Sequence, residues 1–195
     1  MTLNHCRQEC HGVFATALYE LDWCRRLLER VRDLDAWNEA EVSLEQADAS
    51  FQSRPEQSIR SASILDSGRG AEVLQAFDRK VNSVISPLVS EIWGADVGRI
   101  EGTQLIRYRP GGHYSGHSDS GGCFPERYFT VVCYLNDDFQ GGTTTFPSLD
   151  YRARPQSGKA IVFPSRYFHV ADPVTSGEKF VLITWLCGPV PIRWI

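Results

Sequence analysis

The sequence predicts a mainly β fold of the α+β class, in which helices pack outside an antiparallel sandwich or barrel. Its 195 residues are enough for one domain with a sizeable core, and 42% hydrophobic with 23% charged residues is a globular composition. Two segments with helical periodicity precede residue 100. Beyond that point, short runs rich in Val, Ile, Tyr, Phe and Thr alternate with Gly and Pro turns.

The helical segments are expected at residues 14–34 and 71–93, where apolar residues recur at helical spacing between charged ones. Pro87 should kink or divide the second helix, because proline has no N–H to donate. Residues 38–58 are rich in Glu, Gln, Ser and Ala, which predicts a mobile loop and a candidate lid. A short strand is expected at Ser58–Leu65.

The runs after Gly102 predict strands because they are short, dense in β-formers and bounded by glycine or proline. They are Thr103–Arg109, Tyr128–Leu135, Thr143–Phe146, Tyr151–Arg154, Lys159–Phe163 and Lys179–Cys187. We therefore expect residues 1–195 to form a single domain. Residues 1–100 would supply helical support, the candidate lid and the first strands, and residues 101–190 the β core with the site.

Charge and hydropathy argue against two classes of partner. Twenty Lys and Arg against 24 Asp and Glu give a net charge of −4, which gives no basis for general binding to nucleic acid. No apolar run reaches the roughly 18 residues of a membrane-spanning helix. Because the first residues lack the basic-then-apolar order of a signal peptide, we expect a soluble cytoplasmic protein.

The six cysteines are expected to be free thiols, since their spacing is irregular and no export signal precedes them. Four residues near the N-terminus could bind zinc: His5, Cys6, Cys10 and His11. The gap between the two cysteines is wider than in a Cys-x-x-Cys pair. The favoured interpretation is therefore a chance cluster.

A second metal-binding candidate consists of His117, Asp119 and His169. On an extended backbone, residues two apart point to the same side, so His117 and Asp119 can converge. Two imidazoles and one carboxylate form the facial triad of non-haem Fe(II) oxygenases. A tetrahedral zinc site is the competing interpretation, and a turn-capping aspartate with two half-buried histidines is the structural one.

Lys179 lies ten residues after His169, with turn-forming residues between them. We expect the two segments to be antiparallel neighbours, with both side chains facing the interior. The strand after Lys179 is strongly apolar, and a buried lysine needs an anion. A dicarboxylate that chelates the metal through a 2-oxo-acid group would meet this need, helped by hydroxyls of Tyr108 and Thr184.

Longer motifs surround these residues, in unbroken order between about residues 100 and 190. They are Gln104–Tyr108, Gly112–Asp119, Arg127–Asp137, Gly141–Pro147, Pro155–Phe163 and Gly177–Trp185. In these motifs the sequence resembles the Fe(II)/2-oxoglutarate dioxygenases, and among them the prolyl 4-hydroxylase-like branch.

The resemblance implies a double-stranded β-helix (jelly-roll) core with supporting N-terminal helices. It also implies Fe(II), 2-oxoglutarate as cosubstrate and O₂, with ascorbate as a candidate reductant. The implied iron ligands are His117, Asp119 and His169. The implied cosubstrate-binding residues are Lys179, for the distal carboxylate, with Tyr108 and Thr184. The implied substrate-side residues are Tyr114, Arg127 and Trp185.

The reaction implied by the resemblance is hydroxylation of an unactivated C–H bond with release of succinate and CO₂. The substrate would be a proline, another amino acid, or a peptide, carrier-bound or natural-product intermediate. Asp119 favours hydroxylation over halogenation, because it supplies the third protein ligand. Two alternatives remain open: a non-catalytic cupin-like module that binds metal and ligand, and a zinc hydrolase on a similar barrel.

Overall fold

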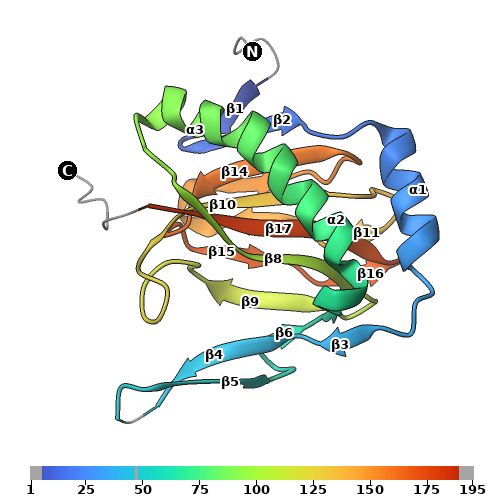
Figure 1. Cartoon of the computed structure of the whole chain (residues 1–195). Coiled ribbons are helices and arrows are strands. Elements are labelled where there is room, and N and C mark those ends of the chain that lie inside the picture. Colours follow the sequence, from blue (N-terminus) through green and yellow to red (C-terminus); the bar gives the residue numbers. More distant parts are fainter. Residues whose placement is uncertain (1–5, 47, 189–195) are drawn as a thin grey trace.

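The computed structural model describes residues 6–46 and 48–188, which form two facing sheets with helices outside one of them (Figure 1). Strand pairing within both sheets is antiparallel. The larger sheet has the order β1 (Cys6–Cys10), β2 (Val13–Ala17), β14 (Lys159–Pro164), β10 (Arg127–Tyr134), β17 (Lys179–Cys187), β8 (Arg99–Tyr108), β7 (Ser63–Leu65) and β3 (Trp37–Glu39).

The smaller sheet has the order β13 (Tyr151–Ala153), β12 (Thr144–Phe146), β15 (His169–Ala171), β9 (His113–His117) and β6 (Arg60–Ser61). Two separate strand pairs are β4 (Glu41–Glu45) with β5 (Phe51–Pro55), and β11 (Gln140–Gly141) with β16 (Val174–Ser176). The mainly β fold with a jelly-roll core and supporting helices is confirmed. None of the helices described has the length and apolar character needed to span a bilayer.

The helices α2 (Ser67–Lys80) and α3 (Ser86–Trp93) lie across the outer face of the larger sheet, and α1 (Leu21–Val31) lies near one end of it (Figure 1). A π-helical segment, Val81–Ile85, joins α2 and α3 immediately before Pro87. The predicted division of the second helix is therefore confirmed, since proline cannot donate the α-helical bond at this point. The helix begins earlier than predicted, because Asp66 caps it by accepting a bond from the backbone N–H of Arg69.

Side chains of β17 alternate between two apolar cores. Phe180 and Leu182 pack with the core between the larger sheet and the helices. Val181 and Ile183 lie with the core between the two sheets. Because Lys179 has the same parity as Val181, its side chain points between the sheets.

The prediction of a helix from residue 14 is wrong for residues 14–20. Residues 13–17 form β2, which pairs with β14, and α1 starts only at Leu21. Val13 and Ala15 are both buried, as expected of alternate positions on a strand. The apolar spacing there fits either element, and pairing with the larger sheet decides between them.

The prediction of a loop over residues 38–58 is also wrong. Most of the segment is the β4–β5 hairpin, in which Glu41 pairs with Pro55 and Glu45 with Phe51. Its polar composition hides the strands, although Val42 is buried as an inward-facing strand residue. A role as a lid stays a prediction.

The predicted pairing of the His169 segment with the Lys179 strand is wrong. His169 starts β15 in the smaller sheet, whereas Lys179 starts β17 in the larger one. Between them, β16 pairs with β11 and the chain crosses from one sheet to the other. The two side chains therefore approach the interior from opposite walls.

The N-terminal zinc candidate is only partly within the described residues, because His5 lies outside them. Cys6 and Cys10 are at the two ends of β1, which pairs with β2, and both are free thiols. Among the described residues, this segment forms no group of three or more metal-ligating side chains.

Candidate active site

Three predicted metal ligands meet at one end of the space between the sheets. His117 ends β9, His169 begins β15, and these two residues are paired across the strands. Asp119 follows β9 at the second position. His117 Nε2 lies 3.4 Å from Asp119 Oδ1, and His169 Nε2 lies 3.6 Å from Asp119 Oδ2. The sequence prediction that these side chains converge agrees with this geometry.

Backbone carbonyls determine which nitrogen of each imidazole faces the centre. His117 Nδ1 lies 2.8 Å from the carbonyl oxygen of Ser115, and His169 Nδ1 lies 2.9 Å from that of Tyr167. A carbonyl oxygen only accepts, so we assign the proton to each Nδ1. Each Nε2 then presents a lone pair to Asp119.

The protonation states leave this cluster rich in acceptors. Burial lowers the pKa of His169 to about 4, so its imidazole is neutral. Although burial opposes ionisation, the pKa of Asp119 lies below its usual range, and the hydrogen bond that Thr130 donates to the carboxylate contributes to this lowering. Three acceptors directed at one point repel each other unless a cation lies between them. With ligand atoms all within 4.8 Å of one another, the cluster fits a divalent metal ion.

Lys179 supplies the opposite charge from the other sheet. Its residue is only 2% exposed, and Nζ donates to the carbonyl oxygen of Gly142 at 2.8 Å. Nζ also lies 4.9 Å from the Tyr108 ring centroid and 5.6 Å from that of Tyr134. Among the described residues, no carboxylate oxygen lies within 4.0 Å of it, and burial lowers its pKa to about 7. The Asp172 carboxylate offsets this lowering only in part, and a buried ammonium that forms no close ion pair fits an anionic ligand.

One cavity of about 540 Å³ connects the metal cluster with the lysine. The predicted site residues that line it are His117, Asp119, His169, Lys179, Tyr108, Tyr114, Arg127 and Trp185. The cavity therefore places a site for a divalent cation and a site for an anion in the same space, as a chelating dicarboxylate requires.

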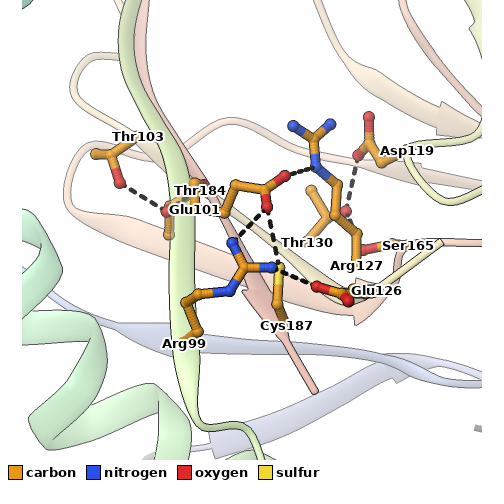
Figure 2. A network of polar contacts seen from close by, with 10 residues as sticks. All are labelled: Arg99, Glu101, Thr103, Asp119, Glu126, Arg127, Thr130, Ser165, Thr184 and Cys187. Carbon is orange, nitrogen blue, oxygen red and sulfur yellow. Dashed lines mark hydrogen bonds and ion pairs between the residues drawn. The ribbon is translucent and has the colours of Figure 1, made fainter. Parts of the chain in front are cut away.

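The predicted substrate-side residues lie around the metal end of this cavity. The Tyr114 ring stacks on the His117 imidazole at 3.6 Å between centroids. The Arg127 guanidinium lies 3.8 Å from the Trp185 ring centroid, and its Nε donates to Glu101 at 2.8 Å (Figure 2). Glu101 thus holds one edge of the guanidinium, and the aromatic ring supports its face.

Thr184 is the one predicted site residue that does not line the cavity, because it lies on the other face of β17. Its hydroxyl donates to the carbonyl oxygen of Glu101 at 3.2 Å and lies 2.7 Å from Thr103 Oγ1 (Figure 2). Thr103 in turn donates to Asp78 in α2. The Thr184 hydroxyl therefore makes its hydrogen bonds on the helix side of the sheet, away from the cavity in which the cosubstrate is predicted to bind.

Comparison with known proteins agrees with this geometry. The model of the 2OG-Fe(II) oxygenase superfamily matches residues 103–187, which include the three metal-ligand candidates and Lys179. In these residues the chain resembles the 2OG-Fe(II) oxygenase superfamily. The predicted resemblance is confirmed, including its prolyl 4-hydroxylase-like branch.

Curated relatives and solved structures of this superfamily carry prolyl hydroxylase names. A putative prolyl 4-hydroxylase of Acanthamoeba polyphaga mimivirus is 30% identical over 57% of this chain and 56% of its own length. Prolyl 4-hydroxylase subunit alpha-1 of Gallus gallus is 32% identical over 58% of this chain and 26% of its own length. The chain thus spans about half, or less, of these relatives.

The fold extends over more of the chain than the sequence matches do. A Pseudomonas putida prolyl-4-hydroxylase superposes with a TM-score of 0.66, at 20% identity, over 96% of this chain and 95% of the other. A Trichoplax adhaerens prolyl hydroxylase, in complex with a hypoxia inducible factor peptide fragment, gives 0.69 at 16% identity over 90% and 83%. The jelly-roll core with its supporting helices is the arrangement they share.

Sequence analysis missed two polar residues that line this cavity. Arg60 lines the cavity 4.9 Å from the Tyr114 ring centroid and donates to the side-chain oxygen of Gln104 at 3.2 Å. Thr144 also lines the cavity and accepts a 2.7 Å bond from the Tyr134 hydroxyl. In the sequence, Arg60 and Thr144 are simply polar residues within predicted strands. Such residues do not indicate which face of the strand lines a cavity.

Proposed function

We propose that this chain is an Fe(II)- and 2-oxoglutarate-dependent dioxygenase that hydroxylates an unactivated C–H bond and releases succinate and CO₂. The observation that carries the proposal is the shared cavity. An acceptor cluster suited to a divalent metal and a buried ammonium that forms no close ion pair line one cavity from opposite sheets.

Within this proposal, His117, Asp119 and His169 hold the metal, and Lys179 binds the far carboxylate of 2-oxoglutarate. When bound, Fe(II) supplies the oxygen activation and the redox chemistry of the reaction. The chain's own residues position the cosubstrate and exclude water. Tyr108, beside Lys179 in the strand pairing, contributes an aromatic wall and a buried hydroxyl at the anion end.

A prolyl residue in a peptide is the substrate class we favour, with a free amino acid or carrier-bound intermediate next. The names of the curated relatives and the peptide complex of the Trichoplax adhaerens structure support this choice. Residues of the β4–β5 hairpin line part of the cavity, and Tyr114, Arg127 and Trp185, which line it as well, are our candidates for contacts to the substrate. Ascorbate as reductant and a cytoplasmic location are further predictions of the same assignment.

A substrate screen that follows succinate and product mass tests the proposal. Purified protein with Fe(II), 2-oxoglutarate and O₂ would be given free proline, prolyl peptides and unrelated amino acids. We expect succinate in stoichiometric amount with a product that has gained one oxygen atom. The variant H117A should lose this activity, whereas H113A, a control on the same strand outside the cavity lining, should keep it.

Two outcomes would contradict the proposal. Product formation without O₂ would indicate a zinc hydrolase, since hydrolysis needs only metal-bound water. Binding of metal and 2-oxoglutarate without succinate release, for every substrate tested, would indicate a non-catalytic cupin-like module.

A further inference from the structure

The Asp119 carboxylate is hydrogen-bonded to the buried hydroxyl of Thr130, which in turn contacts the buried hydroxyl of Ser165. Thr130 Oγ1 donates to Asp119 Oδ2 at 2.7 Å, and Ser165 Oγ lies 2.9 Å from Thr130 Oγ1 (Figure 2). Both hydroxyl residues are 0% exposed. The hydroxyl of Thr130 has a single proton, which it donates in the hydrogen bond to Asp119. In the contact between the two hydroxyls, Ser165 must therefore be the donor.

The same serine also ties down the backbone of the carboxylate. The N–H of Asp119 donates to the carbonyl oxygen of Ser165 at 2.8 Å. Ser165 follows β14 and precedes β15, whose first residue is His169. The contacts therefore link three segments: the turn after β9, strand β10 and the turn that leads into the second histidine.

This arrangement treats the two carboxylate oxygens differently. Oδ2 accepts the hydrogen bond from Thr130 and also lies 3.6 Å from His169 Nε2, whereas the nearest polar contact described for Oδ1 is His117 Nε2 at 3.4 Å. A carboxylate free to rotate could bind a metal through both oxygens and occupy an extra coordination position. A carboxylate with one oxygen already hydrogen-bonded is oriented to bind through the other.

We propose that Thr130, supported by Ser165, is a positioning residue that directs Asp119 Oδ1 toward the metal and makes the carboxylate a one-oxygen ligand. This inference rests on the proposed function only in assuming a metal on the triad. It requires neither a particular substrate nor turnover.

Metal binding measured without turnover tests the inference. Co(II) and Mn(II) would be titrated into metal-free protein, with affinity from calorimetry and coordination from the Co(II) absorption spectrum. T130V keeps the shape and removes the hydroxyl, and we expect its affinity to fall about 10- to 100-fold with a changed spectrum. T130S should restore both, and S165A should give a smaller loss in the same direction.

T184V is the matched control. Thr184 is equally buried, lies on the neighbouring strand of the same sheet, and makes hydroxyl hydrogen bonds on the opposite face. T184V should therefore bind metal like the unmodified protein, even though it also loses buried hydrogen bonds. Thermal melting of each metal-free variant separates loss of folding from loss of affinity.

Unchanged affinity and an unchanged Co(II) spectrum in both T130V and S165A would overturn the inference. A fall in stability without a fall in affinity would do the same, because it assigns the hydroxyls to packing alone. If the unmodified protein binds metal no better than H117A, the proposed function fails instead, and the two failures are thus distinguishable.

Discussion

The two ends of the cavity place charge in opposite ways. At the metal end, a carboxylate and two imidazoles beside the smaller sheet direct acceptor atoms at one point. At the other end, the larger sheet buries an ammonium whose nearest described hydrogen-bond partner is a neutral carbonyl. Each end is costly alone and is relieved by a partner of opposite sign. The comparison teaches that the cavity favours a cation at one end and an anion at the other.

Removal of the carboxylate should break the metal end alone, with the largest effect that we expect. In D119A the two imidazoles remain but the negative ligand is lost, so metal affinity should fall at least 100-fold and hydroxylation should be abolished. Calorimetric metal titration and succinate release would measure this. Full turnover by D119A would contradict the triad.

Removal of the ammonium should break the anion end and leave the metal end intact. In K179M a carboxylate would enter the buried site without a charged partner, which costs about 2 kcal/mol or more, or roughly 30-fold in 2-oxoglutarate affinity. Metal affinity without cosubstrate should be unchanged. The measurement is titration of 2-oxoglutarate into metal-loaded protein, and equal affinity in K179M would remove the lysine from this role.

Burial of the Lys179 ammonium should also make the free energy of unfolding depend on pH. Its pKa is about 7 in the folded protein and 10.5 ordinarily, so between these values the unfolded chain binds more protons. The free energy of unfolding should therefore rise with pH from 7 to about 10, by up to about 1.4 kcal/mol per pH unit. The contribution of Lys179 is the difference between the free energies of unfolding of the unmodified protein and K179M, measured by denaturant unfolding at each pH.

Bound 2-oxoglutarate should remove that rise, because a carboxylate beside the ammonium keeps it protonated in the folded state. A difference between the unmodified protein and K179M that does not depend on pH would show that the lysine is not buried as a cation. Because Lys179 loses its proton as the pH rises above 7, we also expect 2-oxoglutarate to bind more weakly there.

Sequence reasoning found both ends of the site but not the way in which they are joined. Motifs such as His117-x-Asp119 are local, and strand periodicity can direct both residues to one side. The crossing of the chain between His169 and Lys179 is not local. It depends on β16 pairing with β11, and short strands of two or three residues carry too little pattern to predict their partners.

The errors at the N-terminal half have the same origin. Residues 13–17 have apolar spacing that suits a helix or a strand, and the free edge of β14 makes them a strand. The β4–β5 hairpin is polar along most of its length, so that its pairing, rather than its composition, defines it. Tertiary contacts decided both cases.

The prediction for Thr184 is based on residue type, without knowledge of the strand face on which its side chain lies. Its substitution should have the smallest effect on 2-oxoglutarate affinity. In T184V, 2-oxoglutarate affinity should change less than twofold, because the hydroxyl faces Thr103 and the helices. In T144V, a cavity hydroxyl is lost and the affinity should fall by up to about 1 kcal/mol, or roughly fivefold. Titration of cosubstrate into both variants makes the test. The reverse order would place Thr184, rather than Thr144, on the anion side of the sheet.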